Sequence, residues 1–215
     1  MSKYNFSEKN MRLYAVTDRA WVGDKSLLWQ VEQALEGGVT CVQIREKDME
    51  PEEFLQEAIT MKELCDKYNV PLIINDNVEI AVKIGAAGVH VGQGDMPIAE
   101  VRRIAGDDII VGVSARTVEQ AKEARDGGAD YLGVGAVFGT TTKHDARPIE
   151  RETLQAICNA VDIPIVAIGG VSKDNILKLK GTGVNGVAVV SGIFAADDIK
   201  TRCEELRSLS EDMVK

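Results

Sequence analysis

Short, mostly apolar runs alternate along the chain with longer segments in which apolar residues recur every three or four positions. Runs rich in β-branched residues are typical of buried strands, and the longer segments are typical of amphipathic helices. Four of the junctions between a helical segment and the next apolar run contain glycine, in the related phrases EGGVTCVQI, IGAAGVHVG, DGGADYLGV and GTGVNGVAV. Helical patterns cover residues 26–38, 51–68, 117–128 and 172–183, and the strand pattern covers residues 11–18, 40–46, 71–76, 88–92, 108–115, 131–138, 164–170 and 186–194.

Repeated units of this kind predict a parallel sheet covered by helices. An open doubly wound sheet and a closed barrel both satisfy the pattern. The open sheet is favoured by a glycine fingerprint after the first strand, but residues 17–23 read TDRAWVG and contain none. Eight units without that fingerprint favour an α/β fold of the (β/α)₈ TIM barrel type, as a compact single domain over residues 1–215.

Composition narrows the class of protein further. The sequence has no run of about eighteen apolar residues and no apolar centre near its start, which predicts a cytoplasmic protein without a membrane partner. A net charge of −9 argues against nucleic acid as a partner. The four cysteines form no C-x-x-C pair and are expected to be reduced core residues. Small-molecule substrates are expected, and assembly into a homo-oligomer is left open by the sequence.

The second predicted strand ends in polar residues. Alternation of side chains places Gln43, Arg45 and Lys47 on one face and Ile44 and Glu46 on the other. Because active sites of such barrels lie at the carboxyl ends of the strands, the first three are expected to face the mouth and bind an anion. Alternatively, Arg45 and Lys47 simply pair with a neighbouring carboxylate such as Glu46.

Acidic residues follow the next two strands. Asp76 comes after Asn75 at the end of the third strand, and Asp95 follows the fourth. Adjacent parallel strands bring these positions together, and one or two carboxylates combined with substrate phosphate oxygens are a usual Mg²⁺ site. The alternative is that Asp76 and Asp95 cap the helices that follow.

The later strand ends add a hydroxyl and several glycines. Ser114 is placed to donate a hydrogen bond to a ligand, while Gly133 and Gly135 leave a wall without side chains, to be filled by a ligand or by large residues opposite. Residues 139–143 combine backbone N–H groups, hydroxyls and one ammonium group, which together suit a phosphate. The alternative is a solvated turn. Glycines and one serine after strands seven and eight also match a phosphate site, and helix capping is the competing use for these glycines.

These residues carry a family resemblance. In order along the chain, QIREK, IND, HVGQGD, GVSA, TTTK, AIGG and VS resemble the motif series of thiamine phosphate synthase. The resemblance implies the (β/α)₈ fold and a reaction in which 4-amino-2-methyl-5-hydroxymethylpyrimidine diphosphate and a thiazole phosphate give thiamine phosphate and pyrophosphate, with Mg²⁺ as cofactor.

The resemblance also implies roles for individual residues. Asp76 and Asp95 would bind Mg²⁺. The catalytic set would be Arg45, Lys47, Ser114 and Lys143. The substrate-binding set would be Gln43, Ile44, Arg45, Glu46, Lys47, Asn75, Ser114, Thr140, Thr141, Thr142, Lys143, Gly170, Val190 and Ser191.

Two other functions are weighed against this one. A thiazole tautomerase of the same superfamily handles a thiazole phosphate alone, and a noncatalytic barrel would only bind a phosphorylated ligand. The cationic groups and the two carboxylates favour the synthase, because a departing diphosphate gains negative charge in the transition state. The thiazole nitrogen attacks through a lone pair and needs no general base. His90 and His144 are therefore expected to be structural or solvated.

Overall fold

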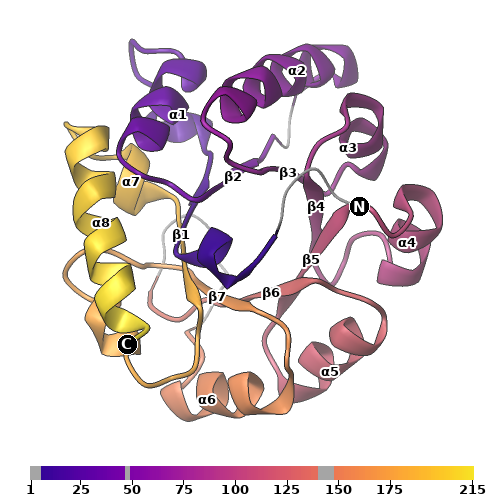
Figure 1. Cartoon of the computed structure of the whole chain (residues 1–215), viewed down its shortest axis with the longest axis vertical. Helices are drawn as coiled ribbons and strands as arrows, with labels where there is room; N and C mark the ends of the chain where they lie inside the picture. Colours follow the sequence, from indigo (N-terminus) through magenta and orange to yellow (C-terminus); the bar gives the residue numbers. More distant parts are fainter. Residues whose placement is uncertain (1–5, 47–48, 140–147) are drawn as a thin grey trace.

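Eight parallel strands close into a barrel in chain order, with β1 paired to β8 (Figure 1). The computed structural model describes residues 6–46, 49–139 and 148–215. The TIM barrel predicted from the sequence is confirmed, and each predicted run contains one strand. The strands are β1 Leu13–Val16, β2 Cys41–Ile44, β3 Leu72–Asn75, β4 Gly88–Val91, β5 Ile110–Ala115, β6 Tyr131–Gly135, β7 Ile165–Ile168 and β8 Gly186–Val189.

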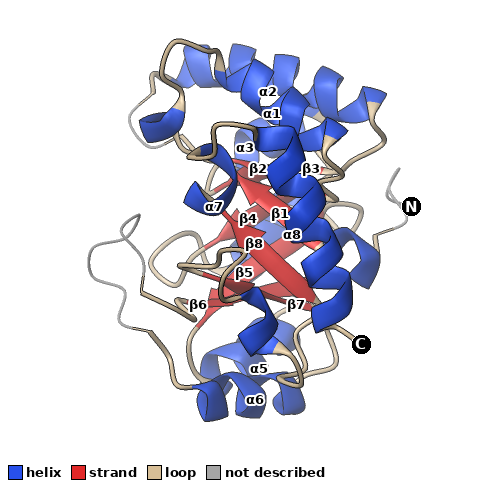
Figure 2. Cartoon of the chain, turned by 90° about the vertical axis from the view of Figure 1, so that its left-hand side faces the viewer, coloured by secondary structure: helices blue, strands red, loops and turns tan. Residues whose placement is uncertain are grey.

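Helices surround the strands as an outer layer (Figure 2). Several begin at a side chain that caps the first turn, such as Ser26, Asn77, Thr117 and Asp198. No helix among the described residues is both long and apolar enough to cross a membrane. The α-helices are α1 Leu27–Glu36, α2 Pro51–Lys67, α3 Val78–Ile84, α4 Ile98–Ala105, α5 Val118–Asp126, α6 Arg151–Ala160, α7 Ser191–Phe194 and α8 Ile199–Met213; the 3₁₀ helices are η1 Glu8–Met11, η2 Arg19–Trp21 and η3 Ile176–Leu179.

The helical segment predicted over residues 172–183 is only partly present. It forms the single 3₁₀ turn η3. Its two buried residues, Ile176 and Leu179, are three positions apart, which fits the three residues per turn of a 3₁₀ helix. Gly181, with φ 76°, lies in the left-handed region where the segment ends.

Two apolar cores follow from the alternation of side chains along the strands. Outward-facing residues such as Val42 and Ile44 pack against the helices and are fully buried. Inward-facing residues such as Tyr14, Ile73 and Tyr131 form a second cluster inside the barrel. The barrel is therefore filled by side chains below its mouth, and a substrate has room only near the carboxyl ends of the strands.

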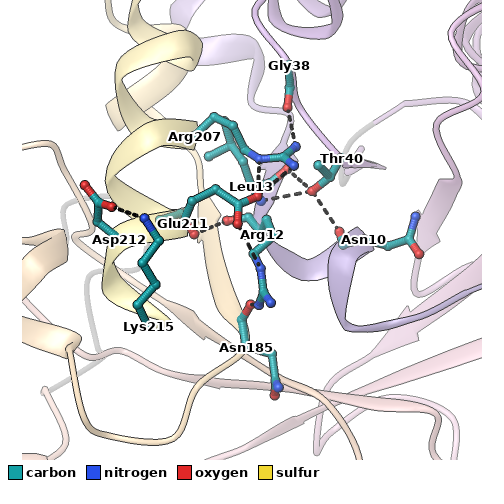
Figure 3. A network of polar contacts seen from close by, with 11 residues as sticks. Asn10, Arg12, Leu13, Gly38, Thr40, Asn185, Arg207, Glu211, Asp212 and Lys215 are labelled. Atoms are coloured by element: carbon teal, nitrogen blue, oxygen red, sulfur yellow. Dashed lines mark hydrogen bonds and ion pairs between the residues drawn. The ribbon is translucent and has the colours of Figure 1, made fainter.

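At the amino end of the barrel, a polar network joins residues 10–13 to the carboxyl-terminal helix α8 (Figure 3). Arg12 donates to the carbonyl of Asn185 before β8 and pairs with Glu211 of α8, Nε to Oε2, at 3.5 Å. Arg207 holds the same carboxylate at 2.8 Å and donates to the carbonyl of Gly38 at 3.1 Å. The network therefore ties α8 to the junction of β1 and β8, opposite the mouth.

We expect Arg12→Leu to lower the free energy of unfolding by about 2 kcal/mol, because a part-buried carbonyl and Glu211 both lose a charged partner. Arg103→Ala is the control, since its pair with Glu100 is exposed and should contribute less than about 1 kcal/mol. Urea denaturation measures both. Activity per folded molecule should not change in Arg12→Leu, and an equal effect of the two substitutions on stability would contradict the role given to the network.

Candidate active site

The end of β2 presents Gln43 to the inside of the barrel. Its side chain is buried, and Nε2 donates to the hydroxyl of Tyr14 at 2.8 Å. Arg45 lies two positions further, on the side that alternation gives to the mouth. Its backbone N–H donates to Thr17 Oγ1 at 3.0 Å, and its guanidinium makes no hydrogen bond or ion pair with the described residues. Arg45 is therefore available to an anion, while Lys47 lies outside the described residues.

Glu46 turns away from this cation. Its carboxylate pairs with Arg19 at 2.8 Å, and Arg19 also pairs with Glu57 of α2 at 2.5 Å. The pairing of Arg45 with Glu46 considered above is not observed; Arg19 occupies that carboxylate instead. Ile44 lies with its side chain in the core between the sheet and the helices. The pair of Glu46 and Arg19 thus anchors the loop that carries Arg45, and the Glu46 carboxylate does not neutralise the charge of Arg45.

The pKa of Glu46 is raised, because burial disfavours its charge more than Arg19 favours it. Its stabilising contribution is therefore greatest below the ordinary glutamate pKa of 4.5 and is lost as the pH rises through the higher folded value. We expect wild type to lose stability relative to Glu46→Gln across that window, measured by thermal denaturation at several pH values. Glu100→Gln should show the opposite sign, since Arg103 lowers the pKa of Glu100. A difference between wild type and Glu46→Gln that stays flat with pH would contradict this interpretation.

A chain of polar side chains crosses the inside of the barrel. Ser114 Oγ lies 2.9 Å from His90 Nε2, and His90 Nδ1 lies 3.0 Å from the hydroxyl of Tyr131. That hydroxyl is 2.8 Å from the hydroxyl of Tyr14, which accepts from Gln43. The chain therefore joins two predicted substrate-binding residues, Gln43 of β2 and Ser114 of β5, through three side chains without a predicted binding role.

Two glycines make room for this chain. A Cβ on Gly112 would lie 2.1 Å from Tyr131 Cζ, and one on Gly133 would lie 3.1 Å from His90 Cε1. The wall left by Gly133 is thus filled by a large residue, one of the two possibilities drawn from the sequence. Gly135 has a different reason, since its Cβ would lie 1.9 Å from the carbonyl oxygen of Ile168. His90 is structural, because it fills the space beside Gly133 and links Tyr131 to Ser114. His144 lies outside the described residues.

The two predicted metal ligands are not helix caps. Asn77 caps α3 by accepting from Ile80 N at 2.9 Å, and α4 begins after Pro97 without a side-chain cap. The capping alternative for Asp76 and Asp95 is therefore wrong. Both aspartates are exposed at neighbouring strand ends, where Asp76 N donates to the carbonyl of His90 at 2.8 Å.

The backbone supports a functional role for Asp76. Its φ is 62°, in the left-handed region that costs a non-glycine residue about 1–2 kcal/mol. Such conformations gather at functional sites. Asp95 Oδ2 accepts from Gly92 N at 2.7 Å, which orients that carboxylate beside the end of β4. Two carboxylates fit a Mg²⁺ site, because Mg²⁺ is usually held by one or two carboxylates and keeps waters or substrate phosphate oxygens in its remaining positions.

Close backbone contacts shape the opposite side of the mouth. Gly169 and Gly170 have φ of 98° and 68°, and a Cβ on Gly170 would lie 2.2 Å from the carbonyl oxygen of Gly139. Val190 and Ser191 follow β8, and Ser191 begins the short helix α7. This side is thus built mainly from backbone groups that can approach a ligand closely. The predicted residues Thr140, Thr141, Thr142 and Lys143 lie outside the described residues.

The sequence did not single out Tyr14 and Tyr131 as part of the site. An aromatic residue within a strand is usually a core residue, and both are fully buried. The available signal was Gly112, a glycine within a strand, which often marks a close approach by another group. Its register partner is Tyr131 on β6, whose ring occupies the space where a side chain would be.

These observations define a (β/α)₈ barrel enzyme with a polar site at the carboxyl ends of its strands. The thiamine monophosphate synthase family model matches residues 13–193, and the chain belongs to this family. It is 52% identical over 200 residues to thiamine-phosphate synthase of Ruminiclostridium cellulolyticum, covering 93% of this chain and 95% of that one. It is also 52% identical over 194 residues to the Clostridium tetani enzyme of the same name, covering 90% and 93%.

A solved structure gives the same result. Thiamine phosphate pyrophosphorylase from Pyrococcus furiosus superposes with a TM-score of 0.89 at 39% identity, covering 97% of this chain and 99% of that one. The family resemblance found in the motifs is therefore confirmed, and the chain is an enzyme of the transferase class in thiamine biosynthesis.

Proposed function

We propose that the chain joins 4-amino-2-methyl-5-hydroxymethylpyrimidine diphosphate to 4-methyl-5-(2-phosphoethyl)thiazole, giving thiamine phosphate and pyrophosphate in the cytoplasm. The proposal rests on the charged residues at the mouth of the barrel. Arg45, which has no partner among the described residues, and the non-capping Asp76 and Asp95 follow three successive strands, β2, β3 and β4. A diphosphate can therefore meet a cation and two carboxylate ligands at one rim.

The reaction breaks one bond and forms another without a proton transfer. The C–O bond between the pyrimidine methylene and the diphosphate breaks, and its electrons leave with the diphosphate. The lone pair of the thiazole nitrogen forms the new C–N bond. Charge grows on the diphosphate as it departs, so a guanidinium that grips its oxygens stabilises the transition state more than the ground state.

Each group of residues has a part in this step. Arg45, with Lys47 and Lys143, would hold the diphosphate. Asp76 and Asp95 would hold Mg²⁺, which when bound neutralises charge on phosphate oxygens. The remaining residues would hold and align the two substrates, which lowers the entropic part of the barrier; they are Gln43, Asn75 and Ser114 for the pyrimidine, and Thr140, Thr142, Gly170, Val190 and Ser191 for the thiazole phosphate.

The test uses purified protein with both substrates and Mg²⁺, and measures pyrophosphate and thiamine phosphate together. Equal amounts of the two products are expected, and neither should form when one substrate is omitted. Isomerisation of a thiazole phosphate without coupling would instead support a tautomerase. Binding of either substrate without turnover would support a noncatalytic barrel.

A further inference from the structure

The hydrogen-bond chain inside the barrel has a direction. Each tyrosine hydroxyl carries one proton, and neutral histidine donates from one ring nitrogen while accepting at the other. Burial raises the pKa values of Tyr14 and Tyr131 well above the ordinary one, so both hydroxyls keep their protons. Once the first donor in such a chain is fixed, every later proton is fixed too, because each hydroxyl can donate only once.

The first donor is the Gln43 amide. With Nε2 of Gln43 donating to Tyr14, the Tyr14 hydroxyl donates to Tyr131 and the Tyr131 hydroxyl donates to His90 Nδ1. His90 must then carry its proton on Nε2 and donate it to Ser114 Oγ. The Ser114 proton has no place in the chain and is left to donate elsewhere. Gln43 keeps its second Nε2 N–H, and its Oε1, which makes no hydrogen bond with the described residues, is left to accept.

Two other proton orders along this chain are conceivable. One leaves a hydroxyl proton without a good acceptor, and the other reverses the donor and acceptor roles of Gln43 and Ser114. If the protons ran from Ser114 toward Tyr14 with the amide unchanged, Tyr14 would accept twice. Its own proton would then have only the buried thiol of Cys41 nearby, a weak acceptor. If the amide were also rotated, the chain would be satisfied, but Gln43 would present a donor and Ser114 an acceptor to the mouth.

We propose that the Tyr14, Tyr131 and His90 chain makes Gln43 a hydrogen-bond acceptor and Ser114 a hydrogen-bond donor toward the substrate, and so selects an aminopyrimidine over its oxo counterpart. An amino group donates and the adjacent ring nitrogen accepts, whereas in the 4-oxo form these roles are reversed. The three chain members are positioning residues, since they act through Gln43 and Ser114. The proposal rests on the proposed function for the identity of the substrate.

The first test reads the direction of the chain without any substrate. Protein labelled with ¹⁵N-histidine is studied by long-range ¹H–¹⁵N correlation NMR, and the His90 signals are assigned by their loss in His90→Gln. The expected result is neutral His90 with its proton on Nε2. A proton on Nδ1 would overturn the proposal, whether or not the enzyme makes thiamine phosphate.

The second test reads selectivity. We expect wild type to prefer the 4-amino pyrimidine diphosphate over its 4-oxo analogue in kcat/KM, and Tyr131→Phe, which interrupts the chain, to reduce that preference by at least about tenfold. KM for the thiazole phosphate should stay unchanged in Tyr131→Phe. Tyr68→Phe is the control, because it removes a hydroxyl from an exposed side chain at the end of α2 and should leave the preference intact.

Folded Tyr131→Phe with the full preference of wild type would overturn the proposal. Absence of product from wild type with the 4-amino substrate would instead refute the proposed function, and the NMR result would still decide the direction of the chain.

Discussion

Replacing Asp76 or Asp95 by Asn is expected to lower kcat by about a hundredfold or more, because charge stabilisation through a bound metal contributes several kcal/mol and about 1.4 kcal/mol corresponds to a factor of ten. Asparagine keeps the shape of the side chain and tolerates the left-handed backbone at Asp76. The concentration of Mg²⁺ needed for half-maximal rate should rise in both variants. Steady-state kinetics over a range of Mg²⁺ concentrations measures both effects.

Binding of the thiazole phosphate should be nearly unaffected in Asp76→Asn and Asp95→Asn, since that substrate is assigned to the opposite side of the mouth. Asp162→Asn removes the same charge from an exposed site before β7, at the amino end of the barrel, and serves as the control. Equal loss of turnover and of thiazole phosphate binding would argue against the division of the mouth into two anion sites.

Replacing Arg45 by Ala is expected to reduce kcat/KM for the pyrimidine diphosphate by about a hundredfold or more. Each hydrogen bond to a charged group contributes about 1.5–3 kcal/mol, and arginine can make two of them to one phosphate. Part of the loss should appear in kcat, because the diphosphate gains charge as it departs. Kinetics with each substrate varied in turn separates the two contributions.

Arg45→Lys provides the matched comparison, because it keeps the positive charge but lacks the planar pair of donors. It should recover part of the activity lost in Arg45→Ala. Full activity of Arg45→Ala would show that this residue does not bind the diphosphate. A change in KM for the thiazole phosphate alone would assign Arg45 to the thiazole phosphate site instead.

The fold was accessible from the sequence because its signal is local. Eight β-branched runs separated by amphipathic segments each form one strand, since the apolar period alone decides which faces are buried. The same alternation placed Gln43 inside the barrel and Ile44 among the helices. The helix predicted over residues 172–183 is too long, because the spacing of Ile176 and Leu179 suits a 3₁₀ turn as well as an α-helix.

The site was accessible only in part, because contacts across the barrel depend on register. Nothing near Asp76 in the sequence reveals its left-handed φ, and Asn77 rather than Asp76 proved to be the cap. The polar chain required the pairing of His90 with Gly112 and of Gly112 with Tyr131 across three strands. Single-strand patterns carry no information on such neighbours.

The most direct test of the account is a crystal structure of the enzyme with pyrophosphate and Mg²⁺. We predict one ion held by both Asp76 and Asp95, with pyrophosphate oxygens completing its ligands and Arg45 bound to the same pyrophosphate. Pyrophosphate bound away from Arg45, or carboxylates of Asp76 and Asp95 that share no ion, would contradict it.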